Sequence, residues 1–282
     1  MQHTPFVQLT EDLTPLYGEG EAKSIARIVI EDAFGARAYT TFMCKTDAET
    51  IKLQQIRAQL IKGEPVQYVL GEADFFGLKY KVSPAVLIPR QETEELVAAV
   101  LAYLPPKPAH VRLLDIGLGS GCIGITLKYK RPDLQLFGFE KSQEALAVAE
   151  ANAVRLLGPG NAHFSLVDIL TKTPEVGEQY EIIVSNPPYI PHHEASLMPR
   201  HVLDHEPELA LFVDNDDPLL FYRVIAGYAR ATLTSGGALF FECNEFNANE
   251  VAILLQQQHF QQVNLLKDLS GADRIVHALY YR

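Results

Sequence analysis

The sequence predicts an α/β protein in which a doubly wound sheet follows a small helical domain and a β-hairpin. Three observations predict this fold. Residues 1–70 place apolar side chains at helical spacing, residues 75–82 switch to alternation, and from Val111 onward short apolar runs alternate with amphipathic ones. Strands that alternate with helices in this way are typical of a parallel sheet covered by helices.

Two helices are predicted in the first part of the chain. One spans residues 22–34 and ends at Gly35, and the other spans 48–61 and stops at Gly63, with Pro65 beyond. Glycine and proline at these places are typical helix stop signals. We therefore expect a helical N-terminal domain over residues 1–71.

A β-hairpin is predicted next, with Gly77 near its turn. We assign residues 72–90 to this hairpin and residues 91–282 to the sheet domain. A helix over 92–104 and a stiff proline linker at 105–108 come before the first strand of the sheet.

The sheet domain contains a regular series of elements. Strands are predicted at residues 112–116, 134–139, 164–167, 182–185 and 238–242, and helices at 122–130, 143–157, 219–233 and 248–259. The last two apolar runs, 263–266 and 274–281, have no helix between them. We expect them to form an antiparallel pair at the edge of the sheet.

Composition excludes several classes of protein. The 282 residues carry a formal net charge of −11 and no basic stripe, which argues against binding to nucleic-acid backbone. The three cysteines, Cys44, Cys122 and Cys243, are far apart and form no CxxC pair, so neither disulfides nor a metal site is expected. The N-terminus resembles neither a signal nor a transit peptide, and no apolar run approaches a membrane span. A cytoplasmic protein is expected.

The most informative segment is Asn186-Pro187-Pro188-Tyr189, which directly follows an apolar strand. Two prolines end the strand abruptly and free backbone carbonyls to point outward. An Asn side-chain oxygen and a Pro carbonyl are then two acceptors for the two hydrogens of a planar NH2 group, and the Tyr ring can cover its flat face. For the tetrapeptide alone, a simple proline turn stays an open alternative.

A glycine-rich loop lies where the first strand of the sheet should end. Glycines alternate at Gly117, Gly119 and Gly121, and the second strand ends at Glu140, where a carboxylate commonly holds ribose hydroxyls. The literal GxGxxG at residues 119–124 is offset from the strand end, and we expect Gly124 inside the following helix. S-adenosylmethionine is favoured as the ligand, while a dinucleotide stays open on the loop alone.

The loop and the tetrapeptide are expected to face the same crevice. In a doubly wound sheet the fourth strand lies beside the first, which brings Asn186 close to Gly117. A methyl donor over the first strand and a nitrogen over the fourth predict methyl transfer to nitrogen.

The chain resembles the release factor glutamine N5-methyltransferases, known as the HemK/PrmC family, nearly from end to end. The matching segments are Gly63-Glu64-Pro65-Val66-Gln67-Tyr68, Gly71, Phe75-Phe76-Gly77, Val86-Leu87-Ile88-Pro89-Arg90-Gln91-Glu92-Thr93-Glu94, Leu114-Asp115-Ile116-Gly117, Asn186-Pro187-Pro188-Tyr189-Ile190, Glu206-Pro207, Ala210-Leu211, Asp268 and Gly271-Ala272-Asp273-Arg274. The chain departs from the family pattern at Leu118, where Thr is usual, at Gln91, where Pro is usual, and at Glu242-Cys243-Asn244, where Glu-Ile-Gly is common.

The resemblance implies a seven-stranded, Rossmann-like S-adenosylmethionine-dependent methyltransferase domain, with a helical domain that helps recognise a protein substrate. That substrate is the glutamine of the Gly-Gly-Gln motif in class I peptide-chain release factors, and the acceptor is its side-chain amide nitrogen. The implied catalytic residues are Asn186, Pro187, Pro188 and Tyr189. The residues expected to bind the cofactor are Gly117, Leu118, Gly119, Ser120, Gly121, Glu140, Asp168, Ile169 and Asn186.

Several alternatives remain at this level. A ribosomal-protein glutamine methyltransferase and an adenine-N6 methyltransferase use the same box, and a dinucleotide-dependent oxidoreductase or a silent binding module uses the same fold. Asp168 and Ile169 fit either an adenine contact or an ordinary strand-end turn. We expect Arg90 either to link the hairpin to the substrate site or to pair with Glu92 or Glu94 on the surface. A metal site at His192 and His193 is not favoured, because neighbouring side chains in an extended loop point to opposite sides. The two histidines are instead expected to contribute loop polarity or to contact the substrate.

Overall fold

The computed structural model describes residues 4–107, 110–171 and 179–282, which form two compact units. One unit comprises Met1–Glu72 together with Pro199–His205, and the other comprises Ala73–Met198 together with Glu206–Arg282. Residues 1–3, at the predicted N-terminus, and Pro108, the last residue of the predicted proline linker, lie outside the described ranges.

The described part of the first unit is built mainly from helices. It contains α1 (Pro5–Phe34), η1 (Tyr39–Thr41), α2 (Asp47–Leu60), α3 (Val66–Leu70) and α7 (Arg200–His205). A capping box begins α2, because the Thr46 side chain accepts from Glu49 N–H and the Glu49 carboxylate accepts from Thr46 N–H. The ring of His201 in α7 lies 6.3 Å from that of Tyr17 in α1.

The predicted start of the first helix was wrong, because α1 begins at Pro5 rather than at Ala22. Gly18 has φ +76° and breaks the helix into two segments, and this break hides the helical spacing of the first half in the sequence. Leu9 and Leu13, four residues apart, are both buried in the core of the unit and stabilise that first segment.

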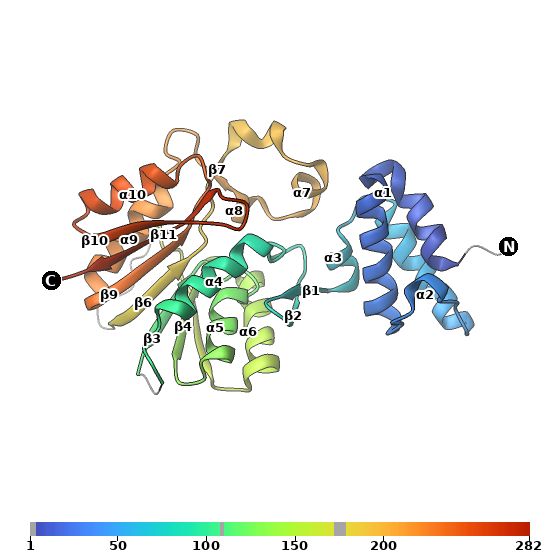
Figure 1. Ribbon diagram of the computed structural model, residues 1–282, viewed down its shortest axis with the longest axis horizontal. Coiled ribbons are helices and arrows are strands. Elements are labelled where there is room, and N and C mark those ends of the chain that lie inside the picture. The colour runs from blue at the N-terminus through green and yellow to red at the C-terminus, as the bar shows by residue number, and fades with distance from the viewer. Residues whose placement is uncertain (1–3, 108–109, 172–178) are drawn as a thin grey trace. The chain divides into compact units, whose positions relative to one another are not determined.

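The second unit begins with the hairpin and is built on a seven-stranded sheet (Figure 1). The hairpin strands β1 (Glu72–Phe75) and β2 (Leu78–Lys81) turn at Phe76 and Gly77, both of which have positive φ. The strand order of the sheet is β10-β11-β9-β6-β3-β4-β5. Its strands are β3 (Arg112–Ile116), β4 (Gln135–Glu140), β5 (Ala162–Leu166), β6 (Tyr180–Ser185), β9 (Leu233–Glu242), β10 (Gln261–Lys267) and β11 (Asp273–Tyr280).

Helices cover both faces of this sheet. One face packs with α4 (Gln91–Tyr103), α5 (Cys122–Lys130) and α6 (Gln143–Leu157), and the other with α9 (Leu220–Thr232) and α10 (Ala248–Gln257). Neighbouring residues of β6 join opposite layers: Ile182 is buried with the first set and Ile183 with the second. This alternation is why the central strand reads as a continuous apolar run.

The strands β3, β4, β5, β6 and β9 run parallel, and β11 pairs antiparallel with both β9 and β10. The predicted antiparallel pair at the edge is therefore confirmed. The strand β9 begins at Leu233, five positions earlier than predicted, since Gly236 and Gly237 masked its start in the sequence.

The segment that follows β6 has a structure that the sequence did not reveal. It contains β7 (Ile190–Pro191), η2 (His192–Leu197), α8 (Glu208–Leu211) and β8 (Phe212–Val213), and β7 pairs with β8. These elements are too short to produce a periodic pattern. Among the described residues, no helix has the length and apolar character needed to cross a membrane.

Candidate active site

A cavity of about 300 Å³ lies at the carboxyl ends of β3, β4 and β6. Strand ends of an open α/β sheet are where ligands bind in such folds. Ten of the predicted site residues line it: Gly117, Leu118, Gly119, Ser120, Glu140, Asp168, Ile169, Asn186, Pro187 and Pro188.

The predicted proximity of the loop and the proline box is confirmed by strand pairing. Ile116 at the end of β3 lies in register with Ser185 at the end of β6. The buried Ser185 hydroxyl also donates to Ile116 O at 2.7 Å, which ties the two strand ends together. Gly117 and Asn186 each follow directly after one of these residues, so both face the same cavity.

The glycine loop leaves open space in front of its backbone. Gly117 and Gly119 have φ of +80° and +52°, and a Cβ added at either position would meet no atom within 4 Å. The N–H groups of Gly117 and Leu118 both donate to Phe139 O, at 2.9 and 3.2 Å, and hold the loop against the end of β4. A side chain at either glycine would project into the space that a ligand needs.

Glu140 is buried at the end of β4 with its carboxylate fixed by two backbone donors. Gly119 N–H donates to Oε2 at 2.8 Å and Ser142 N–H donates to Oε1 at 2.9 Å. Each carboxylate oxygen can accept a further hydrogen bond, so two lone pairs remain for a pair of hydroxyls. The open glycine loop and this anchored acceptor fit the ribose and the amino-acid tail of S-adenosylmethionine.

Gly121 and Gly124 serve packing rather than ligand approach. Gly121 is the N-cap of α5 and does not line the cavity; a Cβ added there would lie 2.6 Å from Ile125 Cδ1. Gly124 lies inside α5 as predicted, where an added Cβ would lie 2.8 Å from Leu136 Cδ1. Asp115, fully buried, accepts from Gly124 N–H at 2.9 Å, and burial raises its pKa to about 8.

Leu118, the residue at which the chain departs from the family pattern, fills a space that Gly138 provides. Its side chain is 3% exposed and packs with Leu146, Ala149 and Phe164. A Cβ at Gly138 would lie 2.5 Å from Leu118 Cδ2. The larger side chain in the loop is thus accommodated by the absence of one in β4.

The Asn186 side chain is held from behind, with its nitrogen turned into the protein. Asn186 Nδ2 donates to Thr93 Oγ1 at 3.3 Å. Ser185 of β6 pairs with Phe241 of β9, so the next residue, Glu242, lies beside Asn186; burial raises the pKa of the Glu242 carboxyl, while Thr93 and Asn186 act to lower it. Because the nitrogen is used in this way, Oδ1 is the atom left to accept a hydrogen bond. Neither Thr93 nor Glu242 was predicted as a site residue, since each lies in a different element from the proline box.

Tyr189 differs from the other three residues of the box. It does not line the cavity and instead packs against the core between the sheet and α9 and α10. Burial raises the pKa of its hydroxyl to about 12. The covering of the acceptor group by the Tyr189 ring stays a prediction.

Asp168 forms an ion pair with Lys141 beside the cavity, with 3.0 Å between Oδ2 and Nζ. Burial acts to raise the pKa of Asp168, but hydrogen bonds from Lys141 and from the Leu170 N–H outweigh it and hold the pKa below its ordinary value. The carboxylate is thus ionised and fixed at neutral pH.

The surface pairing expected for Arg90 with Glu92 or Glu94 was wrong. Arg90 pairs with Glu206, at 2.5 Å from Nη2 to Oε1, and the same buried carboxylate accepts from Ile88 N–H at 3.1 Å. Glu94 accepts instead from Phe76 N–H at 2.7 Å. Residues close to Arg90 and to Glu206 in the sequence line the cavity: Ala85, Val86, Leu87, Pro89, Pro207, Leu209 and Ala210. Sequence reasoning missed Glu206 because its partner is 116 positions away.

The two adjacent histidines have ordinary loop contacts. The His192 ring stacks on Phe212 with centroids 4.8 Å apart, and the His193 ring hydrogen-bonds Asn215. Over the described ranges, no three His, Cys, Asp or Glu side chains gather in a way that would hold a metal ion.

The chain is similar to known methyltransferases in sequence and in fold. The family model for the methyltransferase small domain matches residues 93–205. The release factor glutamine methyltransferase of Bacteroides thetaiotaomicron is 39% identical over 274 residues, which cover 96% of this chain and 97% of that protein. The enzyme of the same name from Flavobacterium psychrophilum is 37% identical and is covered to 95%. A methyltransferase from Pyrococcus furiosus has a similar fold, with a TM-score of 0.53, 15% identity and coverage of 80% of this chain and 98% of that one.

Proposed function

We propose that this chain, which belongs to the release factor glutamine methyltransferase family, methylates the side-chain amide nitrogen of the glutamine in the Gly-Gly-Gln motif of class I peptide-chain release factors. The observation that carries this proposal is the arrangement of Asn186. Its side-chain oxygen is the free acceptor atom, and it lies on the strand next to the glycine loop in a common cavity.

S-adenosylmethionine is the methyl donor and supplies an electrophilic methyl group bound to a sulfonium. Within this chain, Glu140 would accept hydrogen bonds from the ribose hydroxyls, and Gly117 and Gly119 would leave room for the amino-acid tail of the cofactor. Asp168, fixed by Lys141, would lie on the adenine side.

An amide nitrogen is a weak nucleophile, so its position relative to the donor matters most. Asn186 Oδ1 and the backbone carbonyl of Pro187 would each accept one N–H of the glutamine amide and orient the nitrogen toward the methyl group. Positioning of this kind contributes up to about 7–11 kcal/mol in ideal systems. The two acceptor oxygens also favour the positive charge that develops on the nitrogen. The proton leaves readily after transfer, so no strong base is required.

We propose that residues 1–71 form a domain that helps recognise the release factor and that residues 72–90 join it to the methyltransferase domain, residues 91–282. A net charge of −11 supports a protein substrate rather than nucleic acid. Release factors act in translation, and we therefore place the enzyme in the cytoplasm.

The direct test is incubation of the protein with a class I release factor and labelled S-adenosylmethionine, followed by mass-spectrometric mapping of the labelled residue. We expect label on the glutamine of the Gly-Gly-Gln loop. A release factor in which this glutamine is replaced by asparagine is the matched control, since it keeps an amide but moves it by one methylene.

Two outcomes would redirect the proposal. Label on a ribosomal protein with none on a release factor would assign the acceptor to that alternative family of substrates. Label on adenine in DNA or RNA, in parallel reactions with the same enzyme sample, would replace the protein substrate altogether.

A further inference from the structure

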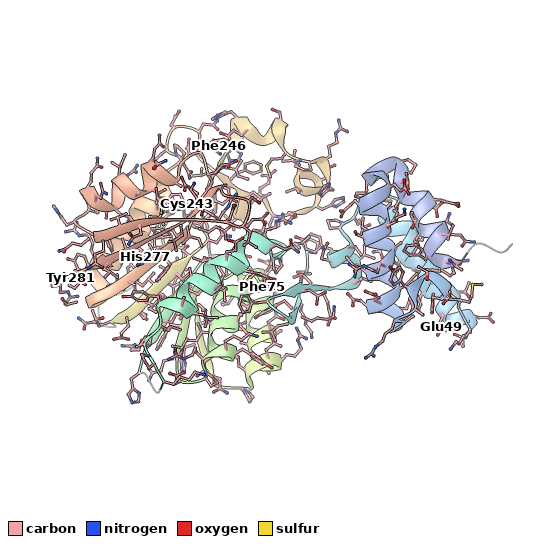
Figure 2. The ribbon with its side chains drawn as sticks, in the orientation of Figure 1. Glu49, Phe75, Cys243, Phe246, His277 and Tyr281 are labelled. Carbon is pink, nitrogen blue, oxygen red and sulfur yellow. The ribbon has the colours of Figure 1, made fainter. Side chains whose placement is uncertain are left out.

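Glu242 is a buried carboxylate at the last position of β9, on the strand next to the one that ends at Asn186. It is 2% exposed, and Cys243, labelled in Figure 2, follows it directly at the carboxyl end of that strand. Its Oε2 atom has no hydrogen-bond partner among the described residues. Burying an incompletely paired carboxylate costs free energy, which suggests that Glu242 serves a function at this position.

The side chains around Glu242 favour one orientation of the Asn186 amide. Ser185 of β6 lies in register with Phe241 of β9, so Asn186 and Glu242, which follow them, are neighbours. Asn186 Nδ2 donates to Thr93 Oγ1 at 3.3 Å, which leaves the hydroxyl hydrogen of Thr93 for another acceptor. An ionised carboxylate only accepts hydrogen bonds, and both Thr93 and Asn186 act to lower the pKa of Glu242, as groups that turn donors toward a carboxylate do.

We propose that Glu242 and Thr93 are positioning residues that fix the Asn186 amide with its NH2 group inward and its Oδ1 toward the methyl acceptor. This inference rests on the proposed function, because it explains how the box presents an acceptor atom rather than a donor. If the amide were flipped, Asn186 would offer N–H groups to the N–H groups of the glutamine, and the contact would be repulsive.

The orientation of the Asn186 amide depends on the ionised state of Glu242. A protonated Glu242 carries an O–H that can donate to Thr93, and the Thr93 hydroxyl can then donate to Asn186 Oδ1, which reverses the orientation. Burial raises the pKa of Glu242 to about 7, although Thr93, Arg274 and Asn186 act to lower it. The titratable groups that act on Glu242 or that it acts on are Arg274, Glu92, Cys122, Tyr189, Tyr222 and Cys243.

The first test compares matched variants by single-turnover methylation of a release factor. Thr93→Val removes the hydroxyl at nearly constant shape, while Thr93→Ser keeps it. We expect Thr93→Val and Glu242→Gln to lower the methylation rate about tenfold, through loss of a fixed orientation, with little change in cofactor affinity. Thr93→Ser should stay near the native rate. Equal rates for Thr93→Val and Thr93→Ser would overturn the role of Thr93.

The pH profile separates positioning from a purely structural role. In the native protein the rate should rise with pH through about 7, as Glu242 loses its proton. In Glu242→Gln this step should disappear, because glutamine does not titrate. A step that persists unchanged in Glu242→Gln would overturn the role of Glu242.

A second readout does not depend on catalysis. The side-chain NH2 signals of Asn186, assigned by their loss in Asn186→Asp, should shift with pH in the native protein and not in Glu242→Gln. Signals that are independent of pH and identical in both proteins would contradict the inference, whatever the enzyme methylates. Signals that titrate as expected in a protein that labels no release factor would support the inference and instead reject the proposed function.

Discussion

The donor side of the cavity, made of the glycine loop and Glu140, joins residues that are close in the sequence, whereas the acceptor side gathers residues from distant elements. Gly119 and Glu140 are 21 positions apart, and Asp115 and Gly124 only 9. On the acceptor side, Thr93 and Asn186 are 93 positions apart. Arg90, which lines the cavity, and its partner Glu206 are 116 positions apart.

This difference shows which interactions fix the residues of each side in position. The donor side is fixed by backbone hydrogen bonds within two successive strand–helix units, which any sequence with the right glycines can form. The acceptor side depends on side chains that meet only after the whole second unit has folded. A substitution of Glu140, which faces the ligand on the donor side, should therefore affect mainly cofactor binding, while loss of a buried acceptor-side partner such as Glu206 should affect stability.

The largest expected effect of this kind is at Glu206. Glu206→Ala removes the buried carboxylate that accepts from Arg90 and from Ile88 N–H. We expect a loss of about 2–3 kcal/mol in the free energy of unfolding, because a buried ion pair is broken. The partial exposure of Arg90 keeps this loss below that of a fully buried pair. Urea unfolding measures this loss. Glu208→Ala, at an exposed position two residues away, is the matched control and should leave stability almost unchanged.

A donor-side substitution should behave differently. Glu140→Ala should weaken the binding of S-adenosylmethionine by about 1–3 kcal/mol, because charge-assisted hydrogen bonds to the ribose are lost. Isothermal titration calorimetry gives the affinity, with Glu150→Ala on the exposed part of α6 as the control. Unchanged affinity in Glu140→Ala would remove this residue from the cofactor site.

The pairing of Leu118 with Gly138 allows a sharper test of local precision. Gly138→Ala places a Cβ 2.5 Å from Leu118 Cδ2 and should destabilise the protein by about 1–2 kcal/mol through overpacking. Leu118→Ala alone creates a cavity and also destabilises. The double variant should be more stable than the sum of the two losses predicts. Strict additivity in thermal or urea unfolding would contradict direct contact between the two positions.

A further expected effect, which shows only as a change with pH, concerns the stability contributed by Asp115. Burial raises its pKa to about 8, so the folded protein keeps a proton that the unfolded chain loses near pH 4. The stability from this group is therefore fully present at low pH, declines as pH rises from about 4 to about 8, and is constant above.

Asp115→Asn should remove that decline and keep the acceptor for Gly124 N–H. The difference in unfolding free energy between native protein and variant, followed across this range of pH, measures the effect. A difference that does not change with pH would show that Asp115 is ionised in the folded protein.

The same contrast explains how much could be read from the sequence. The glycine loop, Glu140 and the proline box were predicted because each is a local pattern at the end of a periodic strand, and the parallel order of strands brought them together. Thr93, Glu206 and Glu242 were not predicted as site residues, since their roles depend on contacts across many intervening residues. The helical start at Pro5 was missed because Gly18 interrupts the pattern, and the short elements after β6 have no periodicity at all.

Asn186 is where the donor and acceptor sides meet, and its variants test most directly whether its side-chain oxygen positions the acceptor amide. The decisive measurement is single-turnover methylation of a release factor by Asn186→Ala and Asn186→Asp, with melting temperatures taken on the same samples. We predict that Asn186→Ala stays folded and loses about 10²-fold or more in rate, and that Asn186→Asp, which keeps an acceptor oxygen, retains part of the activity. A folded Asn186→Ala protein with native rate, or two variants that lose stability together and keep the native rate per folded molecule, would contradict the account.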